Sequence, residues 1–217
     1  MEIVANYKPV LKNEVPVYRE PMTKLFKNKK VFVLGYGSLL YADGWQYRGI
    51  RQPPEAKDLT ECDVKGFKRG PFGIFGISNY YGVIRSSSDG LNGVVLRIND
   101  LTDWVSLMST ELIAGLHMGV NYRVVDVTEN IQGIWTPDKD SVVHMVCNRP
   151  RNRSYCTNTY PGTGMMSGGY YDRVWKGIAS ERTPEFAKKF LETGGFKSNI
   201  QVEEYLQRLK DKNTKRG

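Results

Sequence analysis

The sequence predicts an α+β protein in which short strands fill the chain up to about residue 148 and helices follow. Short apolar runs rich in β-branched side chains recur in the first part, which is the pattern of buried strands. One longer segment, 101–116, instead repeats its apolar residues at helical spacing. Glycines interrupt the β pattern between residues 72 and 84, so we expect the sheet to bend or bulge there.

The expected strands are bounded by glycine, proline, asparagine or aspartate, the residues that favour turns. The sequence SSSDGLNG at 86–93 is typical of such a turn, and it leads directly into one of the strands. The segments expected as strands are 31–34, 61–67, 72–84, 93–98, 122–127 and 141–147.

The first expected helix spans 101–116, and more helices follow in the last part of the chain. Asp100 or Thr102 is a candidate N-cap for it, because a short polar side chain can accept a hydrogen bond from an unpaired backbone N–H. The later helical segments are 171–179, 184–193 and 199–210.

We divide the chain into three parts. Residues 1–30 are interrupted by three prolines and form a lead-in, and residues 31–148 form one strand-rich domain. Residues 149–217 form a loop-rich and helical extension packed on the same domain. A chain of 217 residues is long enough for one generous domain with such an appendage.

The composition favours a folded, basic protein. Hydrophobic residues make up 40% of the chain and aromatic residues 12%, which is enough for a packed core and excludes a wholly disordered chain. The formal charge of +8 permits binding of nucleic acid or of acidic small molecules, and it identifies neither.

The cysteines and histidines show no metal-binding or disulfide pattern. Cys62, Cys147 and Cys156 form no CxxC pair, and His117 and His144 form no HExxH pattern. We therefore expect no metal and no disulfide framework. No stretch approaches the roughly 18–20 apolar residues of a membrane span, and the N-terminus lacks an apolar signal segment. We expect a cytoplasmic protein with no membrane association.

The segment Gly35-Tyr36-Gly37-Ser38 follows a buried strand and is the first candidate for a ligand site. Glycines allow the backbone to approach a ligand closely or to adopt positive φ, and successive N–H groups in such a turn can bind an anion. An ordinary strand-ending turn explains the same residues if nothing else supports the site.

Glu111 is the second candidate. It lies four residues after Leu107 and three after Met108, so on a helix its carboxylate borders the apolar stripe. A carboxylate in that position suits general acid–base chemistry. The alternative is an exposed glutamate on the helix surface, which is the more common place for this residue.

Five motifs occur in an order that resembles the γ-glutamylcyclotransferase-like superfamily, which includes the γ-glutamylamine cyclotransferases, the AIG2-like proteins and the ChaC-type enzymes. They span roughly residues 31–147. Each is short, and the order of all five is more specific than any one of them. The motifs are Tyr36-Gly37-Ser38-Leu39, Lys65-Gly66-Phe67, Gly93-Val94-Val95-Leu96, Leu107-x-x-x-Glu111 and Tyr122-Arg123.

The resemblance implies a small mixed β-barrel with flanking helices and an enzyme that converts a γ-glutamyl amide into 5-oxoproline and a free amine. It implies that Glu111 is the catalytic acid/base and that no cofactor is needed. The matching substrate-binding backbone belongs to Tyr36, Gly37, Ser38 and Leu39. Asn152-x-x-Tyr155 resembles an Asn-x-x-Tyr segment that follows the barrel in ChaC-type members, which implies that Tyr155 closes over the substrate.

The chain also departs from the family pattern. Met108 stands where the family usually has an aspartate, and Leu112 stands where it commonly has glycine. A second hypothesis is therefore a non-catalytic module of the same fold that binds a small molecule or a protein.

A third hypothesis is a nucleic-acid-associated protein. The arginines of RPRNRSYC at 149–156 are interleaved with tyrosine, as in surfaces that bind single strands, although no known nucleic-acid motif is matched. Of the possible partners, we expect a small γ-glutamyl substrate rather than nucleic acid, and the pattern leaves the oligomeric state open.

Overall fold

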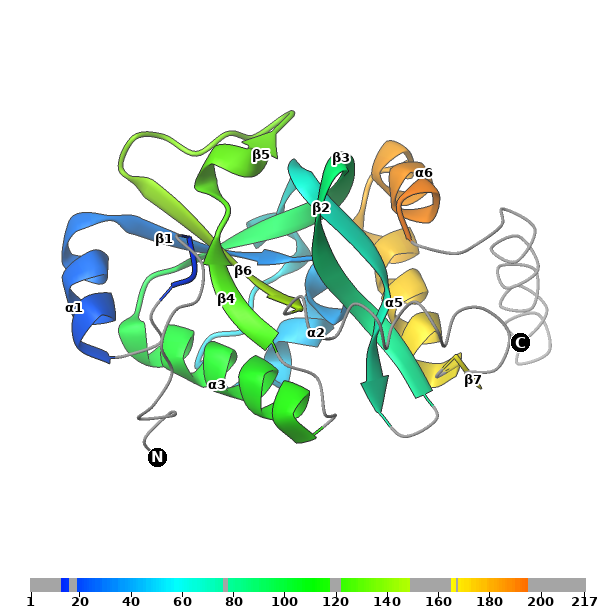
Figure 1. Ribbon diagram of the computed structural model, residues 1–217, viewed down its shortest axis with the longest axis horizontal. Coiled ribbons are helices and arrows are strands. Elements are labelled where there is room, and N and C mark those ends of the chain that lie inside the picture. The colour runs from blue at the N-terminus through cyan, green and yellow to red at the C-terminus, as the bar shows by residue number, and fades with distance from the viewer. Residues whose placement is uncertain are drawn as a thin grey trace.

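The computed structural model describes residues 13–15, 19–75, 78–117, 122–148, 165–166 and 168–194. In these residues, the chain forms one mixed sheet with helices packed against it (Figure 1). The strands are β1 (Lys30–Gly35), β2 (Thr60–Phe75), β3 (Ser78–Ile98), β4 (Tyr122–Asp126), β5 (Ile131–Gln132), β6 (Ser141–Asn148) and β7 (Met165–Met166). The α-helices are α1 (Arg19–Asn28), α2 (Asp43–Gln46), α3 (Leu101–His117), α5 (Gly168–Glu181) and α6 (Pro184–Glu192). Three 3₁₀ turns are η1 (Ser38–Leu40), η2 (Ala56–Asp58) and η3 (Thr128–Asn130).

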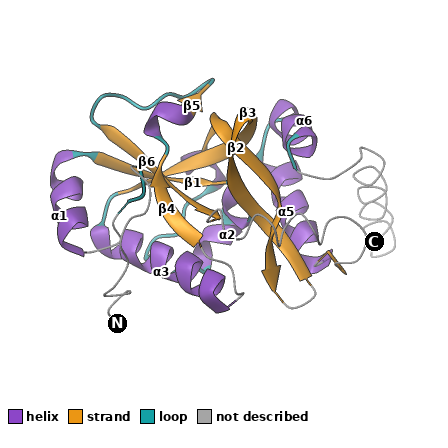
Figure 2. Ribbon diagram, viewed as in Figure 1, coloured by secondary structure: helices purple, strands orange, loops and turns teal. Residues whose placement is uncertain are grey.

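The sheet has the strand order β4-β6-β1-β3-β2-β5, and β7 pairs with β3. β1 lies in the middle, parallel to β6 and antiparallel to β3. The long β2–β3 hairpin curls away from the other strands, so the sheet forms a half-barrel, and helices flank it (Figure 2). The predicted α+β class with a mixed, curved sheet and flanking helices is confirmed.

Side chains alternate along β1 between the two faces of the sheet, as a period of two requires. Val31 and Val33 belong to a core that the helices cover, whereas Leu34 belongs to a second core on the opposite face. β6 divides in the same way, with Val142 in the first core and Val143 in the second. One apolar cluster thus lies between the sheet and the helices, and the other lies on the opposite face, inside the curl of the sheet.

The β2–β3 hairpin is irregular at two places, and only the second overlaps the stretch 72–84 in which glycines were expected to bend the sheet. Its register shifts between Lys65 and Phe67 and again between Gly70 and Gly73. Gly66, inside the first shift, has a φ of 81°, a conformation that disfavours residues with a Cβ. These bulges increase the local twist and allow two long strands to curl.

The turn predicted at 86–93 is wrong, because these residues lie within β3. Lys65 and Phe67 are two positions apart in β2, whereas their partners Gly90 and Arg85 are five positions apart in β3. The extra residues of β3 therefore loop out as a wide bulge, closed by a hydrogen bond between Ser86 Oγ and Asp89 Oδ2. These residues form a bulge and not a turn between strands, because β3 pairs with β2 both before and after them.

The first predicted helix is confirmed as α3. Its cap is Asp100, whose Oδ1 accepts a hydrogen bond from the Thr102 N–H at 2.6 Å. The helices expected at 171–179 and 184–193 correspond to α5 and α6, and the segment 199–210 lies outside the described residues.

The expected lead-in contains a helix that we did not predict. α1 tolerates Pro21 because the proline stands in its first turn, where backbone N–H groups have no partner within the helix. The helix buries Met22 in the core that α3 also contacts. The boundaries at 30 and 148 remain predictions, although Val174 of α5 and Phe186 of α6 pack into that same core. None of the helices in the described ranges is long and apolar enough to cross a membrane.

A buried tryptophan–histidine pair joins α3 to the sheet. Trp104 Nε1 donates a hydrogen bond to His144 Nδ1 at 3.2 Å, so His144 must be neutral with its proton on Nε2. Burial lowers the pKa of His144 to about 4, although nearby Asp126 acts in the opposite direction. An unfolded histidine has a pKa near 6.5. Between these two pH values the unfolded chain binds a proton that the folded chain does not.

This difference predicts a loss of stability in acid. As pH falls from about 6.5 to about 4, His144 alone should lower the free energy of unfolding by about 3 kcal/mol. His144→Asn keeps an acceptor near Trp104 but cannot take up a proton. Denaturant unfolding at pH 7 and pH 4 should therefore show that the free energy of unfolding falls less in His144→Asn than in the wild type. Equal losses in both proteins would exclude His144 as the titrating group.

Candidate active site

A cavity of about 730 Å³ lies between the end of β1, the segment 41–48, α3 and α5. Four residues of the predicted loop, Tyr36, Gly37, Ser38 and Leu39, line it together with Glu111. Tyr155, the remaining predicted site residue, lies outside the described residues. The fold therefore brings the loop and the Glu111 carboxylate of α3 to the same cavity.

The glycines of the loop act through their small size and not through a positive φ. Gly37 has a φ of −134°, and Gly35 is not among the described glycines with positive φ, contrary to one expectation from the sequence. A Cβ at Gly37 would lie 2.8 Å from the Tyr170 hydroxyl, and a Cβ at Gly35 would lie 2.5 Å from the Leu39 carbonyl oxygen. The loop is tight because glycine allows this close approach.

The loop is held from behind by the fully buried side chain of Arg69. Arg69 Nη1 donates a hydrogen bond to the Tyr36 carbonyl at 3.1 Å. Because the C=O and N–H of a trans peptide point in opposite directions, the Gly37 N–H points away from Arg69. Within the described residues this N–H has no hydrogen-bond partner. It is a candidate donor for an oxygen atom bound in the cavity.

Arg69 has neutral partners instead of a carboxylate among the described residues. Its Nη2 donates to Asn92 Oδ1 and to Thr193 Oγ1, both at 2.7 Å, and its guanidinium lies 4.1 Å from the centre of the Phe190 ring. Burial lowers the pKa of Arg69 to about 9, although the nearby Tyr81 and Tyr170 act in the opposite direction. The guanidinium thus ties the loop to β3 and to α6.

Glu111 is joined to the loop through Arg48, a residue that we did not single out in the sequence. Arg48 Nε contacts Glu111 Oε1 at 2.8 Å, and Arg48 Nη2 donates to Ser38 Oγ at 2.7 Å. Burial alone would lower the pKa of Arg48, but the charge and hydrogen bond of Glu111 raise it. Arg48 engages only Oε1, and Oε2 has no hydrogen bond to another described residue.

The walls around Glu111 are apolar and aromatic. Leu107 and Met108 are buried beside it and line the cavity, whereas the Glu111 side chain keeps 21% of its exposure. Burial raises the pKa of Tyr36 well above its usual value, and Tyr122 and Glu111 reinforce this effect. Burial likewise raises the pKa of Tyr170, even though nearby Arg48 acts in the opposite direction. Tyr36 and Tyr170 are therefore neutral hydroxyls that can donate hydrogen bonds to a ligand.

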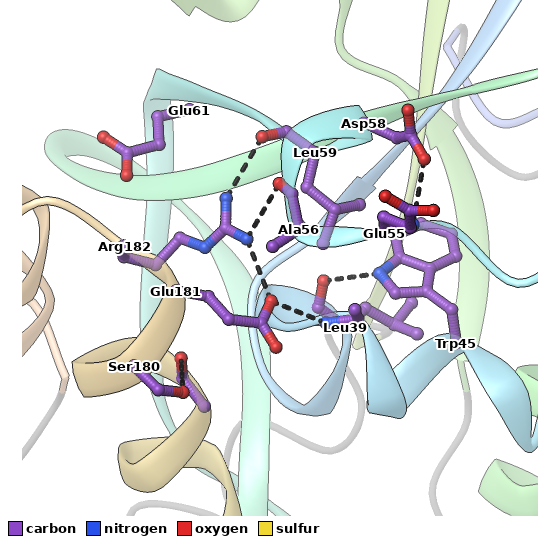
Figure 3. A network of polar contacts seen from close by, with 12 residues as sticks. Leu39, Trp45, Glu55, Ala56, Asp58, Leu59, Glu61, Ser180, Glu181 and Arg182 are labelled. Carbon is purple, nitrogen blue, oxygen red and sulfur yellow. Dashed lines mark hydrogen bonds and ion pairs between the residues drawn. The ribbon is translucent and has the colours of Figure 1, made fainter.

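One face of α5 forms the opposite wall. Its residues in the cavity recur at helical spacing and are Tyr170, Arg173, Lys176, Gly177, Ser180 and Glu181. Glu181 accepts a hydrogen bond from the Ala42 N–H at 2.9 Å, and buried Arg182 donates to the Leu59 and Ala56 carbonyls and to Glu181 (Figure 3). These contacts hold the end of α5 against the segments that follow β1.

The arrangement can support proton transfer and oxyanion binding. It places a carboxylate, a neighbouring guanidinium, an unpaired backbone N–H and neutral hydroxyls around one hollow. Within the described ranges, no three His, Cys, Asp or Glu side chains are grouped so that they could hold a metal ion. The sequence indicated Glu111 and the loop, whereas nothing in the local pattern marked Arg48 or Tyr170.

The contact between Gly37 and Tyr170 predicts coupled substitutions. Gly37→Ala should destabilise the fold by about 1–3 kcal/mol, because the new methyl group overlaps the hydroxyl. Tyr170→Phe removes that hydroxyl, so the same alanine should cost at least about 1 kcal/mol less in the Tyr170→Phe background. Denaturant unfolding of the four proteins of this double-mutant cycle measures the difference. Strictly additive costs would show that the hydroxyl does not restrict position 37.

Comparison with known proteins gives similar folds at low identity. No protein-family model and no curated protein matches the sequence. YkqA from Bacillus subtilis is similar with a TM-score of 0.49 and 16% identity, covering 82% of this chain and 58% of its own. The uncharacterized protein loc79017 from Homo sapiens has a TM-score of 0.45 and 14% identity, covering 82% of this chain and 97% of its own. A gamma-glutamyl cyclotransferase has a TM-score of 0.44 and 15% identity, covering 84% of this chain and 99% of its own. The chain spans a little over half of the length of YkqA.

Proposed function

We propose that the protein is a γ-glutamyl cyclotransferase that converts a γ-glutamyl amide into 5-oxoproline and a free amine. One observation carries the proposal: Glu111 and the loop 36–39 line the same cavity and are linked through Arg48. The ordered sequence motifs support the same assignment. The Met108 departure removes a carboxylate from the cavity wall and leaves Glu111 in place.

In this reaction the substrate's α-amino nitrogen attacks its own γ-carbonyl carbon. The bond from that carbon to the amide nitrogen then breaks, which closes the five-membered ring and releases the amine. The α-ammonium nitrogen loses one proton before the attack and a second as the lactam forms, and the leaving nitrogen gains two protons and departs as an ammonium ion. A single carboxylate can transfer both protons. Because the nucleophile and the electrophile belong to one molecule, correct positioning supplies much of the rate.

Glu111 is suited to the proton transfer because Arg48 holds only one of its oxygens. Oε1 stays in the ion pair, and Oε2 is left to accept the proton from the α-ammonium and to return it to the leaving amine. Arg48 fixes the carboxylate relative to Ser38 and remains cationic, since Glu111 raises its pKa. We assign Arg48 as a positioning residue and Glu111 as the catalytic one.

The loop supplies the second requirement, which is stabilisation of negative charge. As the nitrogen attacks, the γ-carbonyl oxygen becomes an oxyanion. A preorganised backbone N–H lowers the energy of such an oxyanion most effectively where water is excluded. The Gly37 N–H is suited to this role. Arg69 binds the carbonyl of the same peptide unit, at Tyr36, and so fixes the direction of this N–H. The neutral hydroxyls of Tyr36 and Tyr170 can hold the polar groups of the γ-glutamyl unit.

Glu111→Gln tests the acid/base assignment. The amide cannot accept the proton, so 5-oxoproline release should fall by about 10²–10⁴-fold. The melting temperature should stay close to the wild-type value, because glutamine preserves the size of the side chain. Glu129→Gln is a matched control, since Glu129 is exposed on η3 and lies outside the cavity. Full activity of Glu111→Gln, with a screened γ-glutamyl amide, would contradict the mechanism.

Arg48 variants test positioning separately from chemistry. Arg48→Ala should lower kcat by about 10–100-fold, and added guanidinium at low millimolar concentration should restore part of it by occupying the vacated space. Arg48→Lys keeps the charge but cannot reach Glu111, Ser38 and the Gly44 carbonyl together. It should stay well below the wild type in kcat. An unchanged kcat in both variants would remove Arg48 from the proposed site.

A further inference from the structure

We propose that Arg173 and Lys176 form an anion subsite that selects γ-glutamyl amides whose leaving amine carries a carboxylate or a phosphate. Both side chains line the cavity from α5. The inference rests on the proposed function and adds a substrate class to it, because the motifs around Glu111 concern only the γ-glutamyl half of the substrate.

The helix fixes where these cations lie relative to the reacting groups. Tyr170 begins the cavity-lining face of α5, and its hydroxyl lies against Gly37 and is hydrogen-bonded to the Ser38 backbone. At 1.5 Å per residue, Arg173 lies about 4.5 Å and Lys176 about 9 Å farther along the helix axis. The two residues are three positions apart and therefore share one face. The two cations therefore line the cavity farther along α5 than the contact between Tyr170 and Gly37.

The cavity has equal numbers of positive and negative side chains, but Arg173 and Lys176 are not paired with a carboxylate among the described residues. Three cations and three carboxylates line it, and they are Arg48, Arg173, Lys176, Asp43, Glu111 and Glu181. Glu111 is paired with Arg48, and Glu181 is held by Arg182 and the Ala42 N–H. Asp43 is the remaining carboxylate. Among the described residues, neither Arg173 nor Lys176 takes part in an ion pair, so two cations face one uncommitted acid.

This end of the cavity is held in a fixed shape. A Cβ at Gly177 would lie 2.2 Å from the Tyr41 ring, which shows that the ring packs directly on the helix between the two cations and the end of α5. Arg173 is close enough to lower the pKa of Tyr41, although burial of the hydroxyl dominates and raises it. Glu181 and Arg182 anchor the next turn. The two cations thus stand on a helix that is fixed at both ends of the cavity.

The spacing limits the length of the leaving amine. An extended chain advances about 3.3–3.6 Å per residue. With the γ-carbonyl at the Gly37 N–H, an anion one or two residues beyond the amide bond would reach Arg173 or Lys176. Short γ-glutamyl peptides and phosphate-bearing amines satisfy this requirement. Alkylamines have no anion to bind, and diamines bring a positive charge toward two others.

Four probes of similar size test the subsite through 5-oxoproline release. They are γ-glutamylalanine, the γ-glutamyl amide of phosphoethanolamine, γ-glutamylalaninamide and the γ-glutamyl amide of 1,3-diaminopropane. We expect kcat/KM for an anionic probe to exceed that for the neutral amide by about tenfold, as two partly exposed charge contacts would give. The first two probes distinguish a carboxylate from a phosphate, and the diamine should be the poorest substrate.

The double variant Arg173→Gln/Lys176→Gln should bring the ratio of anionic to neutral kcat/KM close to one, mainly through KM. Lys188→Gln is the charge control, because Lys188 is exposed on α6 outside the cavity, and it should leave the ratio unchanged. Higher salt should reduce the preference of the wild type for anionic over neutral probes, because salt screens exposed charges. The proposed subsite would be contradicted if the ratio of anionic to neutral kcat/KM were near one in the wild type, or if the double substitution left the ratio unchanged.

The outcomes separate this inference from the proposed function. Turnover of the neutral amide without any preference would contradict the subsite and leave the proposed function standing. If no probe yields 5-oxoproline, the proposed function fails for these substrates. Calorimetric titration with γ-glutamylalanine and its amide then decides the subsite alone. Tighter binding of the acid, lost in the double variant, supports it, and equal binding of both ligands overturns it.

Discussion

Arg69 lies fully buried where β2, β3, the end of β1 and α6 meet, and the geometry of the cavity depends on its hydrogen bonds. A buried charge is costly unless polar groups surround it. Here carbonyls, an amide and a hydroxyl take that role, together with the face of the Phe190 ring. The hydrogen bond from Arg69 Nη1 fixes the Tyr36 carbonyl, and that carbonyl in turn fixes the direction of the Gly37 N–H. The position of α6 and the shape of the loop are therefore coupled.

Arg182 and Arg48 act in different ways. Arg182 is nearly fully buried and binds backbone carbonyls, so it secures the end of α5. Arg48 is partly exposed and binds Glu111 and Ser38, so it joins α3 to the loop. Planar guanidinium groups can bridge several acceptors at fixed angles, which a lysine cannot do. The arginines consequently join segments that are distant in the sequence.

Sequence patterns predicted the parts of the molecule that depend on short-range order. β1, β4 and β6 were expected from short apolar runs rich in β-branched residues, and α3 was expected from apolar residues at helical spacing. Glu111 and the loop at 36–39 were indicated by the same periodicity and by ordered motifs. The turn expected at 86–93 failed, because pairing with β2 overrode a local preference. α1 was missed because prolines and lysines obscured a helix that only packing against the core stabilises.

By itself, the sequence determined the alternation of strands and helices, the glycines that permit a tight loop, and a carboxylate at the border of an apolar helix face. Only the tertiary structure decided which groups meet that carboxylate. Arg48, Tyr170 and Arg173 belong to segments whose local patterns resemble those of any polar loop or surface helix. They line one cavity because the curled sheet and the fixed ends of α5 bring residues from distant parts of the chain together. A local periodicity reports which side of an element is buried, and it carries no information about what lies across from it.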